Sequence, residues 1–89
     1  MNKIERHKQI LVEMHDLYER KNHDYGDAFG EAYKELGAIS GVTRIYDKFK
    51  RLMTLIKSES KVKDETIDDT LIDLANYCIM LKMEIEDER

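Results

Sequence analysis

Proline is absent from this sequence, and glycine is scarce, with four residues in a chain of 89. Both residue types interrupt helices, because proline lacks a backbone N–H and glycine is conformationally loose. The apolar residues recur at three- and four-residue intervals, which is the spacing of one helix face. We therefore expect an all-α fold, a bundle of about four helices in a single domain over residues 1–89. A chain this short buries a thin core, so we also expect a homo-oligomer.

Cysteine and long apolar runs are also scarce. Cys78 is the only cysteine, which rules out an intramolecular disulfide and favours a reducing compartment. Its apolar surroundings in the sequence suggest a core residue rather than a nucleophile. No N-terminal run resembles a signal peptide, and no stretch is long enough to span a membrane. These absences predict a cytoplasmic protein with no membrane partner.

Charge of one sign does not dominate the chain. Charged residues make up 38% of it, of mixed sign, and the net charge is −4. A domain that binds nucleic acid is usually more basic, so we expect no stable nucleic-acid complex. A local basic stripe remains compatible with this composition.

The apolar pattern divides the chain into four helical segments. We expect helices over residues 3–21, 27–37, 43–57 and 64–86, with a turn at 22–26, a connector at 38–43 and a linker that contains Lys61 to Lys63. The turn follows from the Asn, Asp and Gly of NHDYG, which favour non-helical backbone. Gly37 is a plausible helix stop, and Thr43 and Asp64 are plausible N-caps. The last residues, EIEDER, are expected to fray.

The stretch DETIDDTLIDLANYCIM places an acidic face on a helix that is otherwise apolar. At about 100° per residue, Glu65, Asp69, Asp73 and Asn76 fall on one side of the helix. Burying these carboxylates without partners would be very costly, so we expect cations to meet them. Mg²⁺ prefers carboxylate oxygens and is one candidate. Lysine or arginine from a neighbouring helix is the other, and the sequence leaves both open.

The stretch TRIYDKFKRLMTLIK combines an apolar face with a basic ridge. The face is formed by Ile45, Phe49, Leu52, Met53 and Ile56. The ridge is formed by Arg44, Lys48 and Arg51, at positions i, i+4 and i+7. Arginine suits bidentate contact with phosphate, and lysine supplies a point charge. The ridge can therefore bind phosphates, pair with the acidic helix, or simply face solvent.

The stretch KNHDYGD concentrates polar groups around the expected turn. The side chains that could contact a ligand there are Lys21, Asn22, His23 and Asp24. Tyr25 could stack on a base, since aromatic rings accept any nucleobase face, and Tyr46 is a second candidate for this role. The alternative is an ordinary helix junction in which Asp24 or Asp27 caps the second helix.

Three stretches together, KNHDYGDAF, GVTRIYDKFKRL and DETIDDTLIDLANY, resemble the nucleotide modification associated domain family, first type. This is a small domain of unknown function that is common in phages and their hosts. The similarity covers roughly residues 17–81. It implies a helical domain linked to nucleotide or modified-base metabolism and leaves the activity open.

A weaker similarity connects the chain to the MazG-like all-α NTP pyrophosphatases. Those oligomeric enzymes hold Mg²⁺ with a Glu-x-x-Glu motif on one helix and a Glu-x-x-Asp motif on another. Glu65 and Asp68 formally give the second motif, but the wheel turns Asp68 toward solvent. Glu31 and Glu35 are spaced Glu-x-x-x-Glu, so the first motif is not matched. These departures weigh against a hydrolase.

Three hypotheses about function follow, and no residue is assigned as catalytic. The favoured one is a protein that holds a phosphorylated nucleotide between helices or subunits, and that sequesters a nucleotide signal in phage–host conflict. The second is a Mg²⁺-dependent pyrophosphohydrolase, with Glu65, Asp69 and Asp73 as metal ligands. The third is a helical module that binds a protein partner.

Overall fold

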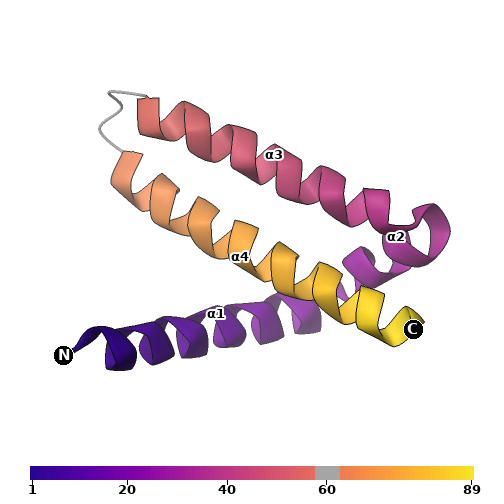
Figure 1. Ribbon diagram of the computed structural model, residues 1–89, viewed down its shortest axis with the longest axis horizontal. Helices are drawn as coiled ribbons and strands as arrows, with labels where there is room; N and C mark the ends of the chain where they lie inside the picture. Colours follow the sequence, from indigo (N-terminus) through magenta and orange to yellow (C-terminus); the bar gives the residue numbers. More distant parts are fainter. Residues whose placement is uncertain (58–62) are drawn as a thin grey trace.

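The structure is a computed structural model that describes residues 1–57 and 63–89, and the side chains of the last helix from Thr66 onward. The described residues form four α-helices and no strand (Figure 1). The helices are α1 (Lys3–Tyr25), α2 (Ala28–Leu36), α3 (Ala38–Lys57) and α4 (Lys63–Glu88). The predicted all-α fold is confirmed. Within these ranges no helix combines the length and the apolar content that are needed to cross a membrane.

The junctions on either side of α2 are shorter than predicted. Residues 22–25 form the last turn of α1, so the predicted turn at 22–26 shrinks to Gly26, whose φ is 73°. Gly37, at φ 80°, ends α2 as predicted, and α3 begins at once with Ala38. The predicted connector at 38–43 is therefore wrong. A glycine in the left-handed region ends a helix and redirects the chain without a longer loop.

The helix ends confirm one predicted cap and correct two other predictions. Asp27 caps α2, because its carboxylate accepts a hydrogen bond of 3.0 Å from the backbone N–H of Gly30. Thr43 lies inside α3, and its hydroxyl donates to the carbonyl of Ile39 at 2.7 Å. The C-terminus does not fray early, since α4 continues to Glu88. The predicted cap at Asp64 falls on a side chain outside the described ones.

The core forms where α2 packs against the first turns of α3 and the second half of α4 (Figure 1). Phe29 is only 4% exposed, and its ring stacks on Tyr77 with 5.8 Å between centroids. Gly41 lets α3 approach closely, because a Cβ there would lie 2.9 Å from Leu81 Cδ1 and from Phe29 Cζ. In the part of the chain that the structure describes, the buried apolar side chains are Met14, Phe29 and Tyr33. The core is therefore as thin as the chain length predicts.

Several apolar residues that were expected inside lie at the surface instead. On α3, Phe49, Met53 and Ile56 are exposed, whereas Ile45 and Leu52 are half-buried. The predicted single face of α3 is thus divided, because α4 covers only one side of it. Cys78, on α4, is exposed as well, so its assignment to the core is wrong.

Candidate functional site

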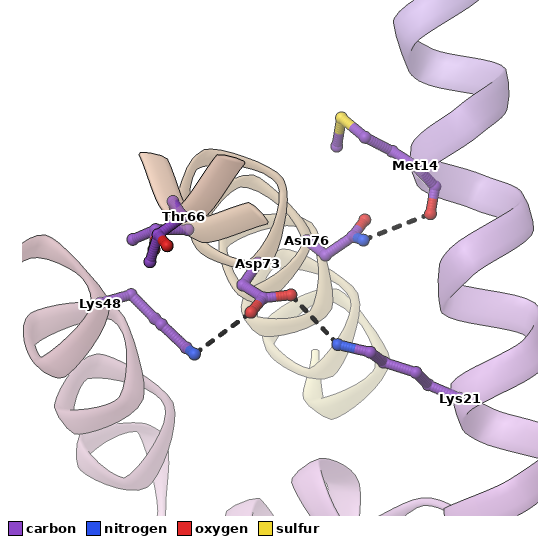
Figure 2. A network of polar contacts seen from close by, with 7 residues as sticks. Met14, Lys21, Lys48, Thr66, Asp73 and Asn76 are labelled. Carbon is purple, nitrogen blue, oxygen red and sulfur yellow. Dashed lines mark hydrogen bonds and ion pairs between the residues drawn. The ribbon is translucent and has the colours of Figure 1, made fainter. Parts of the chain in front are cut away.

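Asp73, at the middle of α4, joins three helices through two ion pairs (Figure 2). Its Oδ1 lies 3.1 Å from Nζ of Lys21 on α1, and its Oδ2 lies 3.2 Å from Nζ of Lys48 on α3. The Asp73 side chain is 22% exposed, so water screens the pairs only in part. The cations that meet this carboxylate are therefore lysines from the two neighbouring helices.

Asn76 lies one turn beyond Asp73 on the same side of α4. Its Nδ2 donates to the carbonyl oxygen of Met14 at 3.2 Å, so α1 is also attached to α4 through its backbone (Figure 2). The predicted face that carries Asp73 and Asn76 exists, and it is the side of α4 turned to α1. These polar contacts fix where the second half of α1 lies on α4.

A pocket of about 150 Å³ opens beside this ion-pair cluster, among the end of α1, the start of α2, and α3 and α4. Its wall is rich in aromatic rings, from Tyr18, Tyr25, Phe29 and Tyr77. Its polar groups include Lys21, Asn22, Arg44, Asp73 and Asn76. Aromatic faces beside cations and amides can hold a flat, polar, negatively charged molecule.

Arg44 is held in the pocket wall by Phe29. Its guanidinium carbon lies 5.4 Å from the centroid of the Phe29 ring, within the range of a cation–π contact. Because Phe29 also stacks on Tyr77, the aromatic wall and the cation are built as one unit. A guanidinium whose position is fixed in this way loses little conformational freedom when it binds an anion.

The structure separates the remaining predicted site residues from this pocket. His23 and Asp24 are exposed and contact each other, with 3.2 Å between Nδ1 and Oδ1. Arg51 is exposed on α3. Tyr46 is exposed too, and Lys50 lies over its ring at 6.0 Å. Of the predicted ligand-binding set, the pocket brings together Lys21, Asn22, Tyr25, Arg44 and Asn76.

Sequence reasoning missed Tyr18, Phe29 and Tyr77 as pocket residues. A signal for the first was present, because Tyr18, Lys21 and Tyr25 are spaced i, i+3 and i+7, as on one helix face. The spacing was hidden by the predicted turn at 22–26. For Phe29 and Tyr77, nothing in the sequence shows that the helix faces that carry them meet beside Lys21.

The predicted magnesium ligands do not form a complete set among the described side chains. Asp69 is exposed, Asp73 is paired with two lysines, and Glu65 lies outside the described side chains. Among the residues described, no three His, Cys, Asp or Glu side chains lie close enough to hold a metal ion. The magnesium site therefore stays a prediction that depends on Glu65.

Comparison with known protein families finds a family model that matches most of the chain. The model of a family described as nucleotide modification associated domain 1 matches residues 21–85, which include the ion-pair cluster and most of the pocket wall. No curated protein and no solved structure matches the chain significantly. The matched range contains all three stretches that carry the resemblance and most of the chain, so the chain belongs to the nucleotide modification associated domain 1 family.

Proposed function

We propose that this protein binds a phosphorylated nucleotide in the pocket beside Asp73. The observation that carries the proposal is the joint presence of aromatic rings and of Lys21 and Arg44 in one pocket wall. Stacking of a base on an aromatic ring is worth about 1–3 kcal/mol. Guanidinium and ammonium groups are the usual protein partners of phosphate. The name of the family, which refers to nucleotide modification, agrees with this class of ligand.

The volume of the pocket suggests which part of the nucleotide enters it and which part stays outside. About 150 Å³ is less than the ~300–1,000 Å³ of a site that encloses a whole drug-sized ligand. We therefore infer that the base enters the pocket and that the phosphates remain at its rim. Tyr25 is 78% exposed and packs on little else, so its ring is free to cover the base. Lys21, itself half-exposed, is suited to the phosphates.

Binding without turnover is the form of the proposal that we favour. A protein that holds a nucleotide lowers the free concentration of that nucleotide. In phage–host conflict, such a protein would sequester a nucleotide signal in the cytoplasm. Support comes from the lysines that already pair with both oxygens of Asp73, which is one of the three predicted metal ligands. We further propose that the protein acts as a homo-oligomer.

Isothermal titration calorimetry with a panel of linear and cyclic nucleotides, up to near-millimolar concentration, tests the proposal. Arg44→Gln should weaken binding at least tenfold, because it removes the fixed guanidinium. Arg51→Gln is the matched control on the same helix and should bind normally, since Arg51 does not line the pocket. Circular dichroism checks that Arg44→Gln stays folded. Absence of binding by the wild-type protein to every nucleotide would overturn the proposal.

Two further measurements sharpen the roles within the site. Tyr25→Ala should weaken binding by roughly 5- to 150-fold while Tyr25→Phe retains it, because only the ring is needed for stacking. Native mass spectrometry of gently purified protein should reveal any nucleotide that is retained from the expression host. Release of phosphate or pyrophosphate during the titrations, with or without Mg²⁺, would contradict binding without turnover.

A further inference from the structure

We propose that the outer side of α3 is the surface through which two copies of this chain associate. Six apolar residues lie along it at intervals of three, four, three, four and three: Ile39, Val42, Tyr46, Phe49, Met53 and Ile56. This heptad spacing keeps the six side chains in one narrow line, as in the seam of a coiled coil. Each is 37–65% exposed in a single copy. We call this line the outer stripe.

The surface and shape of the whole chain indicate that a partner is missing. The accessible surface is 7124 Å², whereas a monomer of 10.6 kDa is expected to expose roughly 5,500 Å². The radius of gyration is 14.5 Å, compared with about 12 Å for a compact chain of this length. The excess surface is about twice the ~800 Å² that one partner contributes to a standard interface. The chain therefore has enough exposed surface for a stable dimer.

A second copy fits the outer stripe because the stripe is complementary to itself in antiparallel pairing. In a two-fold dimer, each contact occurs twice, once from each side of the axis. With the axis between Tyr46 and Phe49, the two ends of the stripe exchange places. The facing pairs are Tyr46 with the partner's Phe49, Val42 with the partner's Met53, and Ile39 with the partner's Ile56. Two aromatic pairs then lie at the centre, where interfaces gain most from them.

The residues beside the stripe favour the antiparallel direction. On one side of the outer stripe, antiparallel pairing places Lys50 next to the partner's Thr43. Parallel pairing would place Lys50 against the partner's Ile45 instead. On the other side, Ile45 faces the partner's Leu52, which adds apolar contact next to the stripe. Opposed helices also bring opposite ends of their dipoles together. The charge and apolar pattern of α3 therefore fits its own copy in one orientation.

The area buried between the two outer stripes determines how tightly the dimer is expected to associate. The exposed parts of six such side chains cover roughly 600 Å² per copy, or ~1,200 Å² in total, which is the lower limit for a specific, stable interface. We therefore expect a dimer that forms at micromolar concentration and dissociates on dilution. An interface of this size makes the monomer observable, so the equilibrium can be measured directly.

The groove between α1 and α4 supplies a matched control. It is also apolar and open, with a volume of about 180 Å³, and it is lined in part by Leu11, Ile79 and Met83. Leu11 is 44% exposed and Phe49 is 48% exposed, so a charge introduced at either position disturbs the monomer to a similar small extent. Only the charge at Phe49 lies in the outer stripe.

Sedimentation equilibrium of the full chain, from roughly 1 to 300 µM, tests the interface. The wild-type protein and Leu11→Glu should both form dimers, and Phe49→Glu should raise the dissociation constant at least 30-fold. Circular dichroism should show equal helix content in all three. A wild-type monomer at the highest concentration would overturn the proposal. So would a dimer that survives Phe49→Glu, or one that Leu11→Glu dissociates instead.

Disulfide cross-linking tests the orientation. In a Cys78→Ser background, Tyr46→Cys and Phe49→Cys variants are oxidised separately and as a mixture. Antiparallel pairing predicts that the mixture gives cross-links between positions 46 and 49 in preference to either homodimer. Cross-links of position 49 to itself as the main product would overturn the antiparallel arrangement.

This inference does not rest on nucleotide binding. Phe49 does not line the nucleotide pocket, so Phe49→Glu should bind nucleotide as the wild-type protein does. The Arg44→Gln variant should dimerise normally. Failure of either proposal can thus be recognised while the other stands.

Discussion

The two sides of α3 differ in a way that hydrophobicity alone does not predict. The side that packs against α2 and α4 carries Gly41, Arg44 and Lys48, whereas the outer stripe is entirely apolar and exposed. The inner side is covered because its polar groups have partners: Arg44 lies over Phe29, and Lys48 pairs with Asp73. These partners offset the loss of hydration. Burial in this small chain therefore follows the partners that are available within it, and we propose that a second copy of the chain covers the outer stripe.

Substitution of the two phenylalanines of the chain should give the largest difference between buried and exposed positions. Phe29→Ala should lower the free energy of unfolding by about 3–5 kcal/mol, because it removes a buried ring from a thin core. Phe49→Ala should lower it by less than ~1 kcal/mol in dilute monomer, since that ring is already half in water. Urea denaturation at low micromolar concentration measures both. Equal losses for the two variants would contradict the division of α3 into two sides.

Concentration adds a second observable to the same pair of variants. The wild-type denaturation midpoint should rise with protein concentration, because dimer formation stabilises the folded state. Phe49→Ala should reduce this dependence. A midpoint that is independent of concentration in the wild-type protein would count against the second copy on the outer stripe.

A leucine introduced on each side of α3 gives the next largest effect. Gly41→Leu should destabilise by about 2–3 kcal/mol, because even a Cβ there would press on Leu81 and Phe29. Asp47→Leu places the same side chain at an exposed position and should change stability by less than ~0.5 kcal/mol. Thermal denaturation followed by circular dichroism compares the two. A tolerated Gly41→Leu would mean that α3 and α4 pack less closely than the structure shows.

The fold class and the need for cations at the acidic face could be predicted from the sequence, because both follow from spacing and from desolvation. The helix ends could not. Asn22, Asp24 and Gly26 together predict a turn, yet the helix continues to Tyr25. Weak local preferences of single residues lose to tertiary contacts, and the last turns of α1 supply Lys21 to Asp73 and Tyr18 to the pocket wall.

The candidate site was only half predictable for a related reason. A helical wheel places Asp73 and Asn76 on one side of α4, but it does not say which helix lies against that side. Lys21 is 52 residues away in sequence from Asp73, and their pairing depends on how α1 crosses α4. The same limit explains why Cys78 and the outer stripe are exposed although their apolar character predicts burial. The sequence predicts that an apolar residue is covered, but it does not show which element covers it.

The two aspartates of the acidic face provide a smaller test of partner-dependent burial. Asp73→Asn should lower the free energy of unfolding by roughly 1–2 kcal/mol, because it leaves Lys21 and Lys48 facing each other without a carboxylate. Asp69→Asn, one turn earlier on the same helix, should change it by less than ~0.5 kcal/mol, since Asp69 is exposed. Urea denaturation at low and high salt measures both changes. An equal effect of the two variants would contradict the ion-pair cluster as a structural element.

Tyr33 offers the test with the smallest expected effect. It is also the most specific test, because the contribution of Tyr33 to stability depends on pH. Its hydroxyl donates to the carboxylate of Glu88, which ties α2 to the end of α4. That hydrogen bond, then burial and the negative charges of Glu88 and Glu84, raise the pKa of Tyr33 above its usual value of 10.0. Above pH 10 the unfolded chain therefore loses this proton while the folded chain still holds it. The stability that Tyr33 contributes is complete below pH 10 and is lost as the pH rises through the folded-state pKa.

Tyr33→Phe should accordingly be less stable than the wild-type protein at pH 7 to 9, and the difference should shrink above pH 10. Lysine titration in that range affects both proteins alike, so it cancels in the difference. Tyr25→Phe is the control for the loss of an exposed tyrosine hydroxyl and should give only a small difference. Urea denaturation at several pH values measures the differences. A constant gap between Tyr33→Phe and wild type would mean that the hydroxyl of Tyr33 is solvated like that of Tyr25, and that α2 is held by its apolar contacts alone.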